Sequence, residues 1–237
     1  MGKNLLSQRR GRGSPTFRAP SFRYAGRAEH PKAVADGAVG VIESFVKSQG
    51  HSTPLMVVSY GKEEALTLAP EGVRVGESLP YGSGADLTPG SVLTLADIPE
   101  GTAVFNIEGR PGDGGRYART SGASARVVAK TPETVTLRLP SKKEKEFNAK
   151  CRATIGVAAG GGRPEKPLLK AGFAYHRAKM KNKFYPSVSA TSMNAVAHPF
   201  GGKGSHTKGR PHQSGRGYPP GRKVGKIAPR RTGRKQR

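Results

Sequence analysis

TVTLRLPS, residues 134–141, is the stretch of sequence that decides the fold. Valine or leucine occupies positions 135, 137 and 139, and these apolar residues alternate with Thr136, Arg138 and Pro140. A period of two is typical of a strand with one face buried and the other toward solvent. The preceding AKTPETV, residues 129–135, has the composition of a tight turn between two strands. We therefore expect an antiparallel sheet here.

Runs of the same kind lie on both sides of this strand. The later series holds SVLTLADI (91–98), GTAVFNIEG (101–109), SARVVAKT (124–131) and FNAKCRATIGVAA (147–159), and the earlier series holds GAVGVIESFVK (37–47), PLMVVSY (54–60), EALTLAP (64–70) and GVRVG (72–76). Turns separate the runs every eight to twelve residues, which predicts an all-β fold of two small barrels or sandwiches, over residues 34–90 and 91–170. No stretch predicts an amphipathic helix of twelve residues or more. Each barrel would be marginal alone, so we expect the two to pack together or to be pinned by a partner.

The two ends of the chain have a different composition. Residues 1–33 hold eight Lys or Arg and one acid, and residues 171–237 hold sixteen basic residues and no acid. The middle is acidic over 34–110, at −6, and basic over 111–170, at +8, which brings the formal net charge to +25. Glycine and proline are frequent at both ends, and neither end shows a sustained period of 2 or 3.6. We expect two long, basic, irregular extensions that become ordered on a polyanion.

Aromatic rings are interleaved with these basic residues. A purely solvated tail does not need aromatic rings. In a nucleic-acid-binding arm, by contrast, guanidinium groups bind phosphates and rings stack on bases. The absence of a helix able to fill a major groove weakens sequence-specific DNA binding, but non-specific nucleic-acid condensation stays as an alternative. The rings in question are Phe17, Phe22, Tyr24, Tyr175, Phe184, Tyr185, Phe200 and Tyr218.

MNAVAHPFGGKGSH, residues 193–206, raises the question of whether His198 is a catalyst. A histidine that acts as general base usually needs an orienting carboxylate or a nucleophile to activate, and no acid follows Glu165. We therefore interpret His198 as a hydrogen-bonding or stacking side chain at a turn, and predict no catalytic residue. An enzyme that acts on RNA with His198 or His176 as its base is the alternative.

Metal, nucleotide and membrane sites have little support in the sequence. No CxxC or HxxxH pair occurs, and Cys151, the only cysteine, is expected to be a small buried hydrophobe. GGKG at 201–204 is no phosphate loop, because Ala197 and Gly204 stand where such a loop needs Gly and Ser or Thr. No apolar run approaches the length of a membrane span. We predict no metal, no cofactor and no membrane. The C-terminal histidines are irregularly spaced, at His176, His198, His206 and His212.

Several long stretches, in the same order, carry a resemblance to a known family. The sequence resembles the universal large-subunit ribosomal protein two family, in its archaeal or eukaryotic-like form, over essentially its whole length. The stretches are QRRGRGSPTFRAPSFRY (8–24), LAPEGVRVG (68–76), PGDGGRYARTSGASA (111–125), LRLPS (137–141), CRATIG (151–156), MNAVAHPFGG (193–202) and GRKVGKIAPRRTGR (221–234).

The resemblance implies an oligonucleotide-binding (OB)-type barrel at 34–90 and an SH3-like barrel at 91–170, with a basic N-terminal arm at 1–33 and a basic C-terminal extension at 171–237. It implies a structural protein in the cytoplasmic ribosome that binds large-subunit ribosomal RNA beside other ribosomal proteins, with no DNA partner. It also implies roles in subunit assembly and association and near the peptidyl-transferase centre. The family's loop histidine, suspected of a direct role in peptide bond formation, corresponds to His198. The bacterial pattern has a second histidine where this chain has Phe200, which argues against a two-histidine mechanism and favours a stacking or packing role for Phe200.

The predicted RNA contacts fall in the two extensions and on the basic face formed by residues 111–170 of the second barrel. They are Arg9, Arg10, Arg12, Arg18, Arg23, Arg116, Arg119, Arg126, Arg152, Lys179, Lys181, Lys183, Asn194, His198, Phe200, Gly201, Gly202, Arg222, Lys223, Arg230, Arg231 and Arg234.

Overall fold

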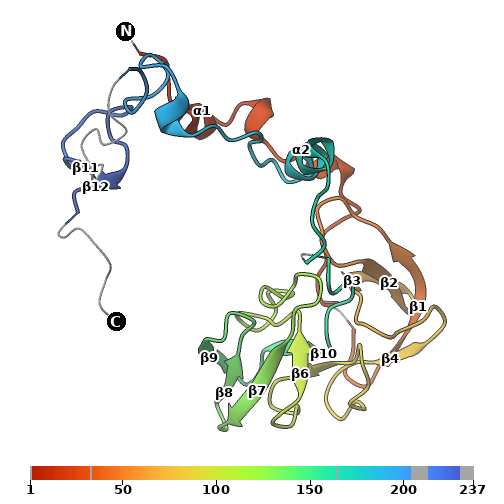
Figure 1. Ribbon diagram of the computed structural model, residues 1–237. Coiled ribbons are helices and arrows are strands. Elements are labelled where there is room, and N and C mark those ends of the chain that lie inside the picture. Colours follow the sequence, from red (N-terminus) through yellow and green to blue (C-terminus); the bar gives the residue numbers. More distant parts are fainter. Residues whose placement is uncertain (1, 33, 164, 204–212, 230–237) are drawn as a thin grey trace. The chain divides into compact units, whose positions relative to one another are not determined.

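The computed structural model describes residues 2–32, 34–163, 165–203 and 213–229. The chain divides into two compact units. One, here called the body, is Ser21–Leu169, and the other, the terminal unit, joins Met1–Pro20 to Lys170–Arg237. Both sheets of more than two strands lie in the body (Figure 1).

The first sheet of the body has four antiparallel strands in the order β3-β2-β1-β4. Its strands are β1 (Val39–Val46), β2 (Leu55–Tyr60), β3 (Glu63–Leu68) and β4 (Ser78–Pro80). The turn between β2 and β3 needs Gly61, whose φ of +73° lies in the region that side chains disfavour. A bulge between Ile42 and Ser44 bends β1 against β2.

The second sheet has six strands in the order β5-β10-β6-β7-β8-β9, and every pair of neighbours is antiparallel. Figure 1 shows β7, β8 and β9 side by side toward one edge. On β8 the predicted alternation is confirmed, since Val135 and Leu137 are buried and Arg138 is exposed. The strands are β5 (Val92–Thr94), β6 (Ala103–Phe105), β7 (Ala125–Lys130), β8 (Thr134–Arg138), β9 (Glu144–Asn148) and β10 (Arg152–Ile155).

The two sheets share an interior. Leu55 and Leu68 of the first sheet pack in one buried cluster with Phe105 of the second and with Ala158. Each sheet also has its own core, and that of the second includes fully buried Cys151. The all-β fold is confirmed, and so is the expectation that Cys151 is a small buried residue. The OB-type and SH3-like identities of the two halves, and their boundary at 90, stay predictions.

The chain from Ser21 onward belongs to the body, although the sequence assigned residues 1–33 to the arm. Ala28 fills a place in the shared core, and His30 is buried with its Nε2 2.6 Å from the carbonyl oxygen of Asn106. A small apolar residue and one histidine produce no periodic signal, and Asn106, the partner of His30, lies 76 positions away in the sequence. A short 3-10 helix, η2 (Ser21–Arg23), stands at the start of the body.

The terminal unit is less irregular than the sequence predicted. It contains α1 (Leu6–Gly11), η1 (Pro15–Phe17), α2 (Ala171–Met180), η3 (Ala190–Ser192) and a parallel pair, β11 (Gln213–Ser214) and β12 (Lys226–Ile227). The expected lack of any helix of twelve residues or more holds within the described ranges, where α2 is the longest, at ten. Helix α2 buries none of its residues, so it has no apolar face that a period of 3.6 could reveal. In the described part of the chain, no helix has the length and apolar character needed to cross a membrane.

Candidate nucleic-acid interface

The net positive charge of the protein lies almost entirely in the terminal unit. Its residues, 1–20 and 170–237, include 22 of the 41 Lys and Arg and none of the 16 Asp and Glu. The body has the remaining 19 basic residues against all 16 acids, a net of +3. A unit with a formal charge of +22 and no acid repels itself, and a polyanion relieves that repulsion.

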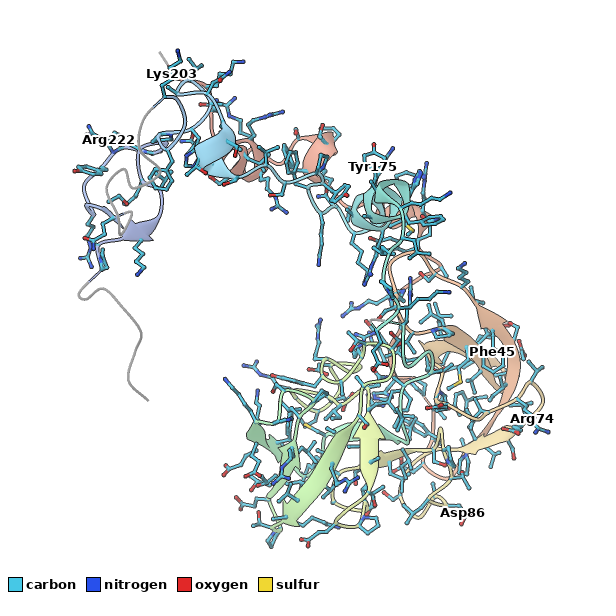
Figure 2. The ribbon with its side chains drawn as sticks, in the orientation of Figure 1. Phe45, Arg74, Asp86, Tyr175, Lys203 and Arg222 are labelled. Atoms are coloured by element: carbon cyan, nitrogen blue, oxygen red, sulfur yellow. The ribbon has the colours of Figure 1, made fainter. Side chains whose placement is uncertain are left out.

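The terminal unit also has almost no interior. Among its described residues only Leu5, Gly201 and Ser214 are buried, and all three hydrophobic core clusters lie in the body. Figure 2 shows side chains crowded between the strands of the body, whereas those of the terminal unit, such as Tyr175 and Arg222, spread outward from the ribbon. Hydrophobic burial within the chain therefore contributes little to the stability of this unit.

Residues 193–202, here called the histidine loop, are closed by backbone hydrogen bonds. The N–H of Gly202 donates to the carbonyl oxygen of Met193 at 2.9 Å, and that of Gly201 donates to the carbonyl oxygen of His198 at 2.9 Å. A Cβ at position 201 would lie 2.3 Å from the Met193 carbonyl oxygen and 2.5 Å from that of Asn194. Glycine is required at 201 because the chain crosses itself there.

His198 is half-buried in this loop, and burial holds its pKa below the ordinary value. Its Nδ1 accepts a hydrogen bond from the N–H of Phe200 at 3.1 Å, and the two rings meet edge to face at 5.0 Å between centroids. A neutral imidazole that accepts at Nδ1 has its proton on Nε2. His198 therefore presents an N–H donor, and its ring contact with Phe200 is the packing role expected for that residue.

The N-terminal arm braces the histidine loop. The N–H of Lys3 donates to the carbonyl oxygen of Val196 at 2.8 Å. Leu5 and Gln8 lie with residues 195–199 around a hollow of about 280 Å³. The Gln8 side-chain oxygen accepts from the N–H of Leu5 at 3.2 Å, which starts α1 at this contact. The two ends of the sequence thus build this part of the unit jointly.

Most of the predicted RNA contacts in the two extensions have exposed side chains. Arg9 and Arg222 stack on rings, with their guanidinium carbons 5.9 Å from the centroid of Phe17 and 4.8 Å from that of Tyr218. Lys223 is half-exposed, Gly202 is exposed and Gly201 is buried. Arg230, Arg231 and Arg234, together with His206 and His212, lie outside the described residues. The exposed members are Arg9, Arg10, Arg12, Arg18, Arg23, Lys179, Lys181, Lys183, Asn194 and Arg222.

The four arginines predicted on the 91–170 barrel divide into two pairs. Arg126, on β7 opposite Arg138, and Arg116, 3.9 Å from an Asp113 carboxylate oxygen, are exposed. Arg119 donates to the carbonyl oxygen of Ala28 at 2.6 Å, and Arg152 donates to the carbonyl oxygen of Pro31 at 2.7 Å. The structure thus gives the last two a role in holding the body together, which the sequence did not reveal.

Arg152 is part of a buried network around Glu108. Its Nη2 lies 2.7 Å from the Glu108 carboxylate, which is fully buried, and Nη1 donates to the carbonyl oxygen of Pro31 and to the Tyr81 hydroxyl. The Glu108 carboxylate also accepts from the N–H groups of Gly112 and Gly114. Burial alone would raise the pKa of Glu108, but the hydrogen bonds and charge of Arg152 outweigh it and hold that pKa below its ordinary value.

In the part of the chain that the structure describes, no three His, Cys, Asp or Glu side chains come together in a group that could hold a metal ion. Burial raises the pKa of the Cys151 thiol to about 11, which disfavours the thiolate that a metal would need. What the described residues of the terminal unit do offer is N–H donors, cations and rings, the groups that contact phosphates and bases.

Comparison with known proteins agrees with this chemistry. A family model for the C-terminal domain of ribosomal proteins L2 matches residues 88–217. The large ribosomal subunit protein uL2 of Methanocella arvoryzae is 49% identical over 235 residues, covering 98% of this chain and 99% of the relative. The uL2 proteins of Halorubrum lacusprofundi and Haloarcula marismortui are 48% and 47% identical, each covering 99% of this chain and 98% of the relative. This chain therefore belongs to the uL2 family of large ribosomal subunit proteins.

Proposed function

We propose that this structural component of the large ribosomal subunit binds the large-subunit ribosomal RNA directly, chiefly through its terminal unit. The observation that carries the proposal is a compact unit with 22 basic residues, no acid, and almost no buried side chain among its described residues. Folded RNA supplies both the counter-charge and the surface against which the exposed rings can pack. The body adds exposed arginines such as Arg116 and Arg126.

The finer roles concern where the protein works. Anchored by its terminal unit, it supports subunit assembly and association, beside other ribosomal proteins in the cytoplasmic ribosome, and organises RNA near the peptidyl-transferase centre. The histidine loop suits the last role because it is small, closed on itself and crossed at Gly201, so it can enter a narrow space between RNA helices.

His198 acts in this proposal as a neutral hydrogen-bond donor that positions RNA, and the protein itself performs no catalysis. Its Nδ1 is engaged by the Phe200 N–H, and the terminal unit has no Asp or Glu side chain to orient an imidazole or to accept a proton from it. Nε2 is therefore left to donate to a phosphate or base oxygen.

Direct RNA binding is tested by comparing folded large-subunit RNA with duplex DNA of equal length at the same salt concentrations. We expect the RNA to bind more tightly, with affinity that falls steeply with salt because many phosphates release counterions. Equal affinity for the duplex would make the protein a non-specific condenser. Cleavage of labelled RNA by the purified protein alone would favour the enzyme alternative instead.

The role of His198 is tested in reconstituted subunits that contain His198→Gln. Glutamine keeps a side-chain donor but cannot titrate, so we expect assembly and peptide synthesis close to those of the wild type across pH. Full assembly with a loss of synthesis that follows imidazole protonation would assign proton transfer to His198 and overturn the positioning role.

A further inference from the structure

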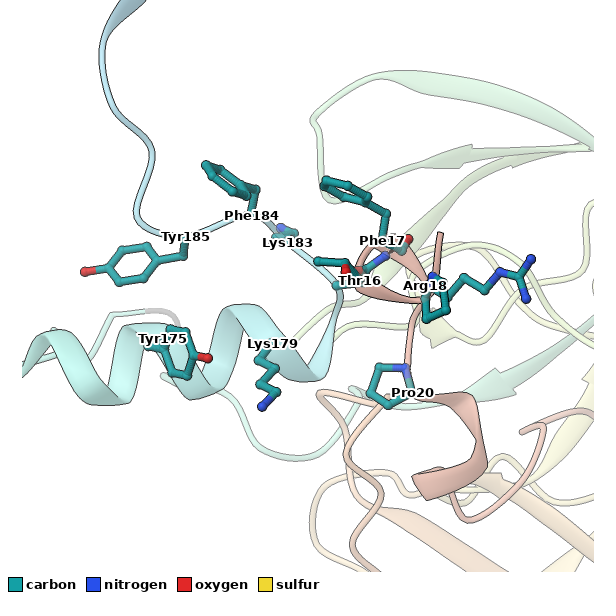
Figure 3. Close-up of a pocket in the computed structure, with 11 residues that line it drawn as sticks. Thr16, Phe17, Arg18, Pro20, Tyr175, Lys179, Lys183, Phe184 and Tyr185 are labelled. Atoms are coloured by element: carbon teal, nitrogen blue, oxygen red, sulfur yellow. Dashed lines mark hydrogen bonds between the residues drawn. The ribbon is translucent and has the colours of Figure 1, made fainter. Parts of the chain in front are cut away.

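A pocket of about 380 Å³ lies wholly within the terminal unit, between residues 15–20, α2 and the turn after α2 (Figure 3). We propose that this pocket, here called the ring pocket, holds one unpaired nucleotide of the large-subunit ribosomal RNA, with its base stacked on aromatic side chains. The inference rests on the proposed function and specifies one point at which the terminal unit grips the RNA.

The pocket is built by segments more than 150 residues apart in the sequence. Tyr175 and Lys179 lie one turn apart on α2, and Lys183 ends the helix by donating its N–H to the carbonyl oxygen of Ala178 at 2.8 Å. The Asn182 side-chain amide donates to the carbonyl oxygen of Phe17. This bond fastens the turn after α2 to the N-terminal arm and holds the two walls of the pocket together.

Four aromatic rings line the pocket, belonging to Phe17, Tyr175, Phe184 and Tyr185. Figure 3 shows that they come from the N-terminal stretch, from α2 and from the turn after it. The last three are 45%, 48% and 37% exposed, although rings of this size are normally buried in a core. The described part of the terminal unit has no such core, so these rings have apolar faces available to a molecule from outside.

The charge around the rings selects an anionic guest. Arg18, Lys179 and Lys183 line the same pocket, and the Lys179 Nζ lies 5.9 Å from the centroid of the Tyr175 ring. The Arg18 guanidinium extends away from the rings, and its Nε donates to the carbonyl oxygen of Gly13 at 2.8 Å (Figure 3). Its Nη groups can contact a phosphate next to a bound base. No Asp or Glu side chain of the terminal unit competes for these cations.

Size and chemistry together point to a single unstacked nucleotide. Pockets of about 300–1,000 Å³ hold small molecules, so this one has room for a base and its sugar but not for a double helix. Bases that are splayed out of an RNA helix are the ones that stack on aromatic side chains. A neutral apolar guest from a protein partner would leave three cations around the pocket without counter-charge.

The test uses the full-length protein bound to folded large-subunit RNA. Tyr175→Leu and Phe184→Leu each remove a ring, whereas Tyr175→Phe keeps the ring and loses only its hydroxyl. Phe173→Leu serves as the control, because Phe173 is 58% exposed on the same helix but does not line the pocket. We expect each ring loss to weaken RNA binding at least about fivefold, with the salt dependence unchanged because no phosphate contact is lost. Tyr175→Phe and Phe173→Leu should bind like the wild type.

Ultraviolet crosslinking of the wild-type complex identifies the guest. We expect adducts between a ring of the pocket and a nucleotide that is unpaired in the RNA, with no displacement of the RNA by excess free mononucleotide. Crosslinks from the rings to a ribosomal protein, adducts with paired nucleotides only, displacement by mononucleotide, or ring-loss variants with wild-type affinity would each overturn the inference. The proposed function would survive these outcomes, since it fails only if the wild-type protein does not prefer the ribosomal RNA to duplex DNA.

Discussion

The backbone N–H of Lys3 donates a hydrogen bond to the carbonyl oxygen of Val196, 2.8 Å away, and so joins the start of the chain to the histidine loop. A proline at position 3 removes that donor, whereas an alanine removes only the side-chain charge. We predict that Lys3→Pro speeds amide hydrogen exchange in the histidine loop of the protein–RNA complex by roughly 2- to 10-fold, the worth of one backbone hydrogen bond. Lys3→Ala should leave it unchanged. Equal exchange in the two variants would show that the loop stands without the arm.

Gly201 lets the histidine loop cross itself, so its substitution tests whether the closed loop matters for RNA binding. In Gly201→Ala the new Cβ meets two backbone oxygens that cannot move without opening the loop. We expect a cost of about 1–3 kcal/mol and a matching loss of affinity for folded large-subunit RNA. Gly217→Ala is the control, because position 217 has an ordinary φ and nothing within 4 Å of a Cβ. Wild-type binding by Gly201→Ala would separate loop closure from RNA binding.

His30 should make the stability of the body depend on pH. Burial lowers its pKa to about 4, from 6.5 in the unfolded chain, so the folded body holds it neutral. Between these two values the unfolded state binds the proton and the folded state does not, and stability falls as pH falls. The free energy of unfolding should fall by about 3 kcal/mol between about pH 7 and about pH 4. Urea unfolding at several pH values measures it.

The control for this effect is His30→Gln, which can still donate to the Asn106 carbonyl oxygen but has no titratable ring. Its stability should lose the part of the pH dependence that lies between the two histidine pKa values, while any contribution from carboxylates remains. An unchanged stability profile in His30→Gln would mean that the folded body binds the proton on His30 as readily as the unfolded chain does.

Arg126 and Arg152, both predicted to contact phosphates, should behave in opposite ways when changed to Gln. Because Arg126 is exposed, Arg126→Gln should weaken RNA binding and reduce the slope of log affinity against log salt by about 1. It should have no effect on stability. Loss of Arg152 leaves the Glu108 carboxylate buried without its cation, so the body should lose about 3–5 kcal/mol while the salt slope is kept. A changed salt slope without a loss of stability in Arg152→Gln would place that guanidinium on the RNA.

The strands could be predicted from the sequence because their signal is local. Val135 and Leu137 alternate with polar neighbours, and each sits where that alternation places it. The resemblance implied a stacking or packing role for Phe200 but did not name its partner, which is the ring of His198, two residues earlier. Cys151 followed the ordinary preference of a lone cysteine for the interior.

The features that sequence analysis missed depend on partners far along the chain. In the sequence Arg152 is not distinguished from the other basic residues, whereas in the fold it binds Glu108, 44 positions earlier. Helix α2 has no buried face to give it a period, and its pocket is completed by residues near Phe17. Contacts between two segments that both lack periodicity leave no trace in either one, so the pairing of the two extensions could only come from the structure.

The pairing of the two ends has a consequence for the order of events during synthesis. Ser21–Leu169 contains all three core clusters and can begin to fold once it has left the exit tunnel. The first twenty residues emerge earlier but must wait for their partners, which begin at Lys170. At about 5–20 residues per second, the intervening stretch of chain takes roughly 8–30 s to make. Throughout that interval the five Lys and Arg side chains of residues 1–20 lack the segment on which they fold, and they can bind other nucleic acids.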